Sequence, residues 1–223
     1  MIFFKKKVKK PTIVAIHGFG LRQEQEFYNL KIALEEKGYQ FKTIRLYNLE
    51  DENDTDWTSW VAKARLLITQ ASFENDVILV GFSMGGVIAS YLANEYRVKK
   101  LILLAPAFEY LNLTTLIDHI PNPFAKNEVK SQIPTNFTNT FIELVYNCKN
   151  SINDIKIPTL IIHCEDDNVI PLSSSNKNIK KIPIDSKALI TISRGQHRIL
   201  DDNIAGPIAI NNIISFIEDK FLK

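Results

Sequence analysis

One stretch of the sequence, residues 77–93, restricts the possible fold more than any other. It begins with four apolar residues, Val77 to Val80, which predict a strand buried on both faces, as in a parallel sheet. The residues Gly81-Phe82-Ser83-Met84-Gly85 follow, and the next residues form an apolar run with helical rather than alternating character. A strand, a G-x-S-x-G turn and a helix in this order predict a tight turn within an α/β sheet.

In such a turn Ser83 is expected to adopt a strained backbone conformation, with the chain too crowded at positions 81 and 85 for a side chain. The strain would hold the Ser83 hydroxyl above the sheet at a helix N-terminus, where developing negative charge is favoured. A phosphate-binding loop is one alternative, but Val87 and Ile88 stand where it needs lysine and a hydroxyl residue. An ordinary strand-to-helix turn is the other alternative. The context favours a serine nucleophile.

The rest of the chain alternates apolar strands with helices. Further strands are predicted at residues 12–16, 41–46, 100–105, 157–162 and 188–192, and helices at residues 22–37, 57–71 and from 207 onward. This alternation predicts an α/β fold with a mostly parallel central sheet of about six to seven strands and helices on both faces. A chain of 223 residues with 45% apolar content is expected to form a single domain over residues 1–223.

The alternation stops in residues 107–153, where three prolines lie among apolar side chains. A long insertion within a compact domain is usually functional, so we expect an irregular cap over the carboxyl edge of the sheet. Phe108, Phe124 and Phe137 of this segment, together with Phe19, are expected to line an apolar substrate pocket. The alternative is that these side chains only pack the cap against the domain.

The composition argues against several kinds of partner. The net charge is +2, and the only charge run, five lysines within residues 5–10, is expected to be a solvated edge rather than a patch for nucleic acid or membrane. Residues 2–4 are too short for the apolar core of a signal peptide, and no apolar run approaches membrane-spanning length. The two cysteines, Cys148 and Cys164, form no C-x-x-C pair and indicate neither a disulfide framework nor a zinc site.

We therefore expect a soluble cytoplasmic protein with no metal, no cofactor, no nucleic-acid partner and no membrane span. Whether it is a monomer or a homodimer stays open.

Four loops at the carboxyl ends of the predicted strands carry groups suited to acyl transfer, and functional groups collect at this edge of open parallel sheets. The loops are His17–Gly20, Ser83–Met84, Glu165–Asn168 and Gly195–His197. Ser83 would be the nucleophile, His197 its base, and a carboxylate of the acidic loop would orient His197. The order serine, acid, histidine along the chain is the one expected when the nucleophile lies on such a turn.

The loop after residues 12–16 would complete the site. The backbone N–H groups of Phe19 and Met84 are expected to receive the oxyanion, usually the largest single contribution to such catalysis. His17 is expected to pin this loop by hydrogen bonding rather than to act as a base. Gly18 and Gly20 match the start of a dinucleotide-binding motif, but Gln23 occupies the position of its third glycine, so this interpretation is weak.

These residues carry a family resemblance. The motifs H-G-F-G, G-F-S-M-G-G, D-D-N-V-I-P and the Gly195–His197 loop resemble the α/β-hydrolase fold family, and more closely the small bacterial carboxylesterases related to monoacylglycerol lipases. The Asp56-Trp57 pair that opens a helix and the Phe141–Val145 run are similar to the same subgroup. The resemblance spans nearly the whole chain and implies that Asp167, which precedes x-V-I-P, is the acid.

Two departures from that family pattern are visible. The usual N-terminal hairpin is reduced to at most Ile2–Val8, which changes a sheet edge remote from the chemistry. Cys164 stands where such enzymes often have glycine, and it places a thiol near the acidic loop. A buried structural role is expected for this thiol rather than reactivity.

The sequence thus predicts a carboxylesterase-type serine hydrolase that cleaves small-molecule esters of short-to-medium acyl chains through an acyl-enzyme intermediate. The alternative is a non-catalytic or slow-turnover small-molecule binding protein of the same fold, because fold alone does not fix function. A metal-dependent hydrolase that uses His163, Glu165, Asp166 and Asp167 is disfavoured. Neighbours on an extended chain alternate faces, so these side chains cannot all converge on one ion.

Overall fold

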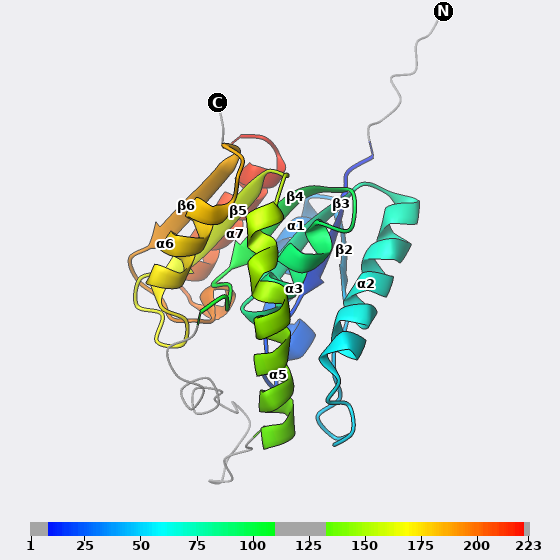
Figure 1. Cartoon of the computed structure of the whole chain (residues 1–223). Helices are drawn as coiled ribbons and strands as arrows, with labels where there is room; N and C mark the ends of the chain where they lie inside the picture. Colours follow the sequence, from blue (N-terminus) through cyan, green and yellow to red (C-terminus); the bar gives the residue numbers. More distant parts are fainter. Residues whose placement is uncertain (1–8, 110–132, 221–223) are drawn as a thin grey trace, which may run out of the picture.

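The computed structural model describes residues 9–109 and 133–220, and its strands form one parallel sheet (Figure 1). The strands are β1 (Thr12–Ile16), β2 (Gln40–Thr43), β3 (Val77–Phe82), β4 (Val98–Leu104), β5 (Thr159–Cys164) and β6 (Lys187–Ile192). They lie in the order β2-β1-β3-β4-β5-β6, and each neighbouring pair is parallel. This confirms the predicted α/β fold with a parallel central sheet, which has six strands in the described part of the chain.

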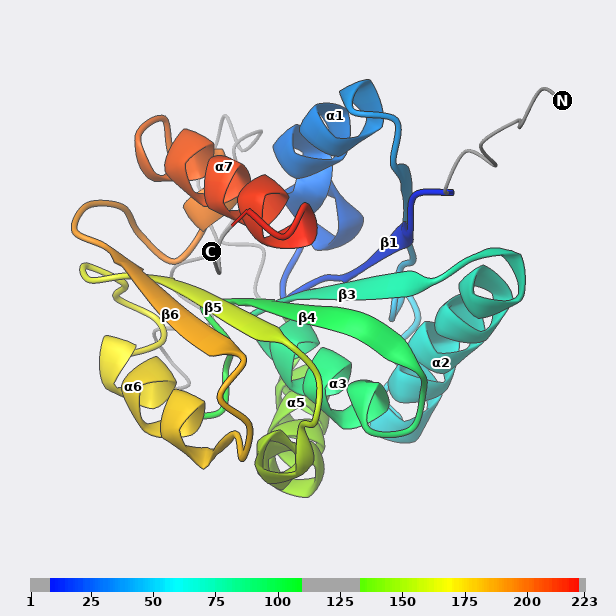
Figure 2. The same cartoon turned by 90° about the horizontal axis from the view of Figure 1, so that it is seen from above.

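Helices cover both faces of the sheet, as predicted. The α helices are α1 (Tyr28–Glu36), α2 (Trp57–Glu74), α3 (Met84–Ala93), α5 (Thr135–Cys148), α6 (Leu172–Lys181) and α7 (Ala205–Ile217), and the 3₁₀ turns are η1 (Gln23–Phe27), η2 (Lys149–Asp154) and η3 (Ile199–Asp201). Seen from above, α1 and α7 lie on one face, and α2, α3, α5 and α6 lie on the other (Figure 2). None of the helices described is long and apolar enough to cross a bilayer.

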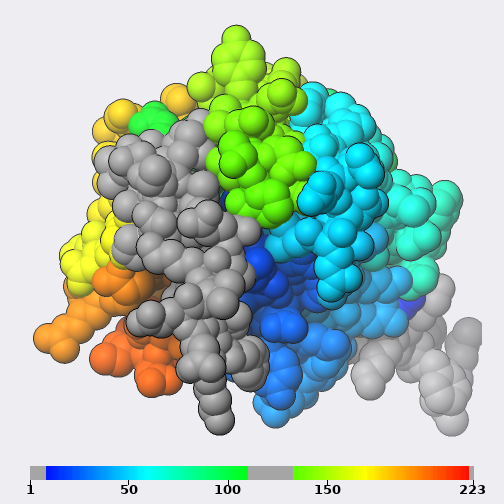
Figure 3. All heavy atoms as spheres, turned by 90° about the horizontal axis from the view of Figure 1, so that it is seen from below, coloured from blue at the N-terminus to red at the C-terminus, as the bar shows by residue number. Residues whose placement is uncertain are grey.

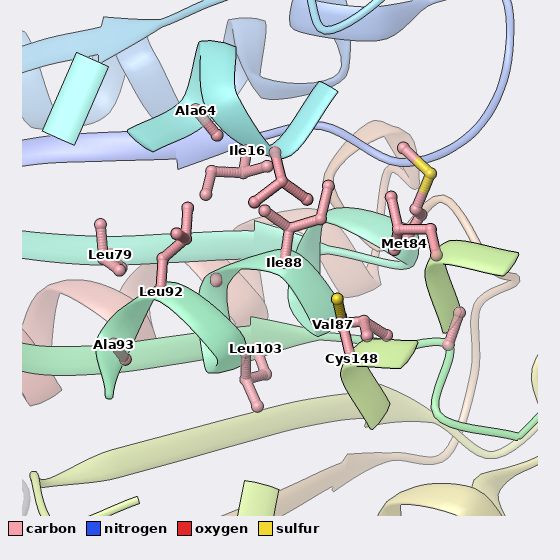
Figure 4. Packing of buried hydrophobic residues seen from close by; sticks show 14 of the residues in the cluster. Ile16, Ala64, Leu79, Met84, Val87, Ile88, Leu92, Ala93, Leu103 and Cys148 are labelled. Atoms are coloured by element: carbon pink, nitrogen blue, oxygen red, sulfur yellow. The ribbon is translucent and has the colours of Figure 1, made fainter. Parts of the chain in front are cut away.

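The core has two parts, one on each face of the sheet. On the α3 side, Ile88 and Leu92 pack over Leu79 and Leu103 of the central strands (Figure 4). The alternate strand residues, such as Ile78, face α1 and α7 in the second part. All residues of β1, β3 and β5 are buried, which is why these strands are continuous apolar runs in the sequence. The sheet edge that carries the site therefore rests on a rigid core.

Two element boundaries differ from the sequence prediction. The strand predicted at residues 41–46 is shorter and shifted, because among the residues described β2 pairs only with Thr12–Ala15 of β1. The helix predicted at residues 22–37 begins instead as η1, whose first residue, Gln23, has a positive φ of 48° and donates from its side-chain amide to the carbonyl of Tyr47 at 3.0 Å. Periodicity alone does not reveal such local contacts between loops.

The prediction that residues 107–153 are irregular is wrong for α5. This helix begins directly after Pro134 and buries one face, with Phe137, Phe141 and Leu144 against the α3 side of the core. Its start lies beside the loop before α2, where Thr140 Oγ1 donates to the carbonyl of Thr55 at 2.7 Å (Figure 3). Residues 110–132 lie outside the described part of the chain, so the cap itself stays a prediction.

The sequence analysis also missed α6. The sequence of this helix, LSSSNKNIKK, is mostly polar, and the side chains that it buries include Ser174, Ser175 and Asn178. Small polar residues on the buried face leave no apolar stripe for periodicity to detect. One of them, Ser175, contacts the acid loop described below.

Candidate active site

The turn between β3 and α3 holds Ser83 in the predicted strained conformation, with φ 52° and ψ −117°. Three backbone hydrogen bonds hold it there. The Ser83 N–H donates to the Leu104 carbonyl at 2.9 Å, and the Ser83 carbonyl accepts from the N–H groups of Gly86 at 3.0 Å and Ala107 at 3.1 Å. The end of β4 therefore fixes the backbone of the serine.

The glycines on both sides of Ser83 are required by close backbone contacts. A Cβ atom at Gly81 would lie 2.4 Å from the carbonyl oxygen of Gly85, and one at Gly85 would lie 1.9 Å from that of Ile16. Both distances are far below van der Waals contact, so no side chain fits. The turn is packed directly against the end of β1.

The structure brings the three predicted triad residues together in one chain of hydrogen bonds. Ser83 Oγ lies 3.1 Å from Nε2 of His197, and Nδ1 of His197 lies 2.8 Å from Oδ2 of Asp167. Ser83 follows β3, His197 follows β6 and Asp167 follows β5. Because all three strands are parallel, these residues lie at the same edge of the sheet. Of the three consecutive acids, Asp167 is buried, whereas Glu165 and Asp166 are exposed.

The carboxylate of Asp167 accepts four hydrogen bonds. Oδ1 accepts from the N–H groups of Val169 and Ile170, each at 2.9 Å, and Oδ2 is shared by His197 at 2.8 Å and Nε2 of His163 at 3.2 Å. Burial raises the pKa of this carboxyl, but the hydrogen bonds from the two imidazoles and from the Ile170 N–H outweigh it and hold the pKa well below its usual range. An ionised carboxylate here fixes a proton on Nδ1 of His197 and leaves Nε2 free to accept one.

His17 pins the loop after β1, as predicted. The N–H of Leu46 donates to Nε2 of His17 at 3.0 Å, so the ring proton lies on Nδ1, which donates to the Gly18 carbonyl at 2.7 Å. Burial lowers the pKa of His17 to about 4, which keeps the ring neutral. Because both ring nitrogens are occupied, His17 supports the loop and has no nitrogen free to act as a base.

Two further side chains, Glu26 and Tyr47, hold the same loop. The Gly18 N–H donates to Oε2 of Glu26 at 3.2 Å, and the Gly20 N–H donates to the Tyr47 hydroxyl at 2.7 Å. The Tyr47 hydroxyl in turn donates to the Gly20 carbonyl at 2.9 Å. Sequence reasoning missed both residues, because they lie in segments that carry no motif.

The two N–H groups expected to bind the oxyanion are left available by this arrangement. The N–H of Phe19 lies between those of Gly18 and Gly20 and has no acceptor in residues 9–109 and 133–220. Met84 is the first residue of α3, and the first N–H groups of a helix have no partner within it. This observation supports the oxyanion assignment, which stays a proposal.

The aromatic residues expected to line a pocket differ in their environments. Phe137 is fully buried and stacks on Trp60 with ring centroids 6.0 Å apart, so its surroundings favour a packing role. Phe19 and Phe108 are 6% and 3% exposed and lie in the loops that follow β1 and β4, and Phe19 also stacks on Phe141 with ring centroids 5.1 Å apart. Phe124 lies outside the described residues.

The four side chains considered for a metal site do not all converge, since Glu165 and Asp166 are exposed whereas His163 and Asp167 are buried. Both ring nitrogens of His163 contact protein atoms, Nδ1 with Ser175 Oγ at 2.7 Å and Nε2 with the Ile170 carbonyl at 3.0 Å. Within the described residues, no three His, Cys, Asp or Glu side chains are grouped to hold a metal ion. The hydrogen bonds of His163 indicate a structural connection to the acid loop instead.

Both cysteines are buried and unpaired, as expected for structural thiols. Burial raises the pKa of Cys164 to about 12 and that of Cys148 to about 11, so neither forms a reactive thiolate near neutral pH. The Sγ atom of Cys164 lies 2.9 Å from where a Cβ would stand on Gly195, which also has a positive φ of 120°. The cysteine thus fills the space beneath the loop that leads to His197.

Comparison with known proteins agrees with this geometry. A sequence model of the alpha/beta hydrolase family matches residues 13–146, more than half of the chain, and a model described as serine aminopeptidase, S33, matches residues 124–203. The protein therefore belongs to the alpha/beta hydrolase family.

Individual relatives agree with this family assignment. The chain is 32% identical over 153 residues to “Putative esterase/lipase 3” of Mycoplasma genitalium, a match that covers 62% of this chain and 54% of that protein. This chain spans about half the length of the esterase/lipase 3 proteins that it matches.

Solved structures show the same fold. One, from work on the metagenome-derived lipolytic enzymes LipS and LipT, has a TM-score of 0.78 at 20% identity and covers 95% of this chain and 94% of its own. A monoglyceride lipase variant from Saccharomyces cerevisiae has a TM-score of 0.76 at 16% identity, and the match covers 98% of this chain and 89% of that protein.

A Glu26→Gln substitution should change how stability depends on pH. Burial raises the pKa of Glu26 from 4.5 to about 7, although the Gly18 N–H and the nearby Arg198 lower it. Between these values the folded chain binds more protons than the unfolded chain, so the stabilisation from this group is lost as pH rises, by up to about 1.4 kcal/mol per unit. The variant should lack this loss.

Urea unfolding of the wild type and the variant across this pH range measures the difference. Glu24→Gln in the same 3₁₀ turn is the matched control, because Glu24 does not bind the loop, and its stability should follow that of the wild type. Parallel stability curves for the wild type and Glu26→Gln would contradict the prediction.

Proposed function

We propose that this chain is a serine hydrolase that cleaves carboxylic esters of short-to-medium acyl chains through an acyl-enzyme intermediate. The observation that carries this proposal is the chain of hydrogen bonds from Ser83 Oγ through His197 to the buried carboxylate of Asp167. The serine lies on a strained turn at a helix N-terminus, which is the position that this chemistry requires.

In the first step Ser83 Oγ bonds to the ester carbonyl carbon while its proton moves to Nε2 of His197. The electron pair of the carbonyl double bond moves to the oxygen, which the N–H groups of Phe19 and Met84 would bind. Asp167 stabilises the imidazolium through the hydrogen bond to Nδ1. The close packing of Gly85 on the end of β1 brings the loop that carries Phe19 near the Ser83 turn and so supports this proposal.

In the second step the tetrahedral intermediate collapses, the bond to the alcohol oxygen breaks, and that oxygen takes the proton from Nε2 of His197. The acyl group is now an ester of Ser83. A water molecule then gives a proton to His197 and attacks the acyl carbon, and collapse of the second intermediate returns that proton to Ser83.

The surroundings of Ser83 support a neutral, apolar acyl group. The ring of Phe82 lies against His197 with centroids 4.9 Å apart, and Phe19 and Phe108 lie in the loops that follow β1 and β4, the two neighbours of β3. We propose that Phe19 and Phe108 contact the acyl chain. A substrate site of this kind is mostly apolar with a few convergent polar groups.

A series of p-nitrophenyl esters from acetate to palmitate tests the substrate class. Each added methylene should stabilise the bound acyl group by up to about 0.8 kcal/mol until the pocket is full. The value of kcat/KM should therefore rise with chain length, peak at a short or medium chain and then fall. A flat series, or a preference for anionic acyl groups, would contradict an apolar acyl site.

Labelling with a fluorophosphonate tests the chemistry directly, because this probe reacts with an activated serine. Mass spectrometry should locate the label on Ser83. Turnover of many ester molecules per protein would then separate an enzyme from a binding protein with a reactive serine. A wild-type protein with neither label nor turnover would refute the proposed function.

A further inference from the structure

We infer that His163 is a second histidine acting on the acid, which positions the Asp167 carboxylate and sets the pH range in which His197 can accept a proton. The inference rests on the proposed function, in which Asp167 orients His197. It assigns His163 as a positioning residue, because it touches neither the substrate nor the reacting atoms.

The position of His163 is defined by contacts on both sides of its ring. The residue lies on β5 and is fully buried. Nε2 lies 3.0 Å from the Ile170 carbonyl and 3.2 Å from Oδ2 of Asp167, and Nδ1 lies 2.7 Å from Oγ of Ser175 on α6. The ring therefore connects helix α6 to the acid loop.

These contacts place a proton on the nitrogen that faces the acid. A carbonyl oxygen only accepts hydrogen bonds, so Nε2 must carry a hydrogen to bind Ile170, and Oδ2 of Asp167 lies 3.2 Å from the same nitrogen. In the neutral ring Nδ1 then accepts from the Ser175 hydroxyl. The Ile170 carbonyl thus selects the tautomer with its proton on Nε2, and the Ser175 hydroxyl completes the pairing of the ring.

The two histidines share one carboxylate oxygen. Oδ2 of Asp167 receives His197 Nδ1 at 2.8 Å and His163 Nε2 at 3.2 Å, while Oδ1 is held by two backbone N–H groups. Every donor to a carboxylate draws on its negative charge. The donor from His163 therefore limits the negative charge that Asp167 presents to protonated His197, and removal of this donor should strengthen that stabilisation.

Few other charges bear on this carboxylate in the part of the chain that the structure describes. The thiol of Cys164 lies behind it and stays protonated, and Asp202 caps the start of α7. Glu165 and Asp166 are exposed on the acid loop. On the α6 side Lys177 pairs with Glu109 at 2.9 Å on the surface. The shared oxygen is thus governed mainly by the two histidines.

A pair of amide substitutions tests the role of His163. Glutamine is long enough to place an N–H where Nε2 stands, whereas asparagine is one methylene shorter and reaches only the Nδ1 position. His163→Asn should raise the midpoint of the acid limb of kcat/KM by about half a pH unit or more. It should also lower the rate on the plateau by roughly 10-fold. His163→Gln should stay near the wild type in both.

Leu34→Ala, a buried truncation in α1 on the other face of the sheet from α6, controls for lost stability (Figure 2). It should lower the melting temperature and leave the midpoint unchanged. If His163→Asn does not fold, His163→Leu replaces it, because leucine fills much of the space of the ring without a donor and should move the midpoint in the same direction. A midpoint that stays fixed in the folded variant, or moves equally in the glutamine variant, would overturn the inference.

An NMR titration of the His197 ring nitrogens in the same proteins needs no substrate. The midpoint of the His197 titration should move to higher pH in His163→Asn and stay unchanged in His163→Gln. If the wild type neither hydrolyses esters nor reacts with a fluorophosphonate, the proposed function fails, and this titration still tests the contact between the histidines. An active wild type whose His197 titration is unaffected by His163→Asn would refute the positioning role alone.

Discussion

Ser83→Ala should abolish ester hydrolysis almost completely while the fold remains. Removal of a triad member typically leaves only the catalysis that comes from binding and from the oxyanion site, roughly 10³–10⁴ over the reaction in water. The loss in kcat should therefore be several orders of magnitude. Steady-state assays with the best p-nitrophenyl ester, combined with circular dichroism, measure both parts of this expectation.

Ser90→Ala is the matched control for this experiment. Ser90 is a second buried serine on α3, and its hydroxyl donates to the Gly86 carbonyl at 2.9 Å rather than to a histidine. This variant should keep most of the activity. If Ser83→Ala turns over at close to the wild-type rate, the nucleophile is another residue.

Asp167→Asn should lower kcat by on the order of 10⁴, because an amide at this position favours the wrong tautomer of His197. The asparagine oxygen can still accept from the N–H groups of Val169 and Ile170, so the loop should keep its shape. Kinetics of the variant measure the loss in kcat, and its crystal structure shows whether the loop keeps its shape.

Asp166→Asn serves as the neighbouring control, because the Asp166 side chain is exposed and makes no contact with His197. We expect it to retain most of the wild-type rate. The opposite ranking of the two variants would show that another carboxylate orients the base.

The sequence was sufficient to predict the parts of the fold that have strong local signals. Buried parallel strands are continuous apolar runs, and the G-x-S-x-G turn has a steric requirement at Gly81 and Gly85 that the contacts confirm. The order of the loops along the chain was enough to bring Ser83, Asp167 and His197 to one edge. These features depend on few residues at fixed spacing.

The features that the sequence did not predict depend on contacts between distant segments. Glu26 and Tyr47 reach the glycine loop from segments without a motif, and His163 meets Ser175 through a helix that buries small polar side chains. The apolar run of β5 predicts a buried strand at His163 but not which atoms its ring contacts. Only the packing of α6 against β5 reveals its partners.

The edge position of β6 has a consequence for how this protein loses activity. Within the described residues β6 pairs only with β5, most of its residues are half-buried, and Thr191 is exposed, whereas β3 and β5 are fully buried. Edge strands open at a lower free energy than central strands, and His197 follows β6 directly. Local fraying at this edge would separate the base from the nucleophile while the core is still intact. Thermal inactivation should therefore precede global unfolding.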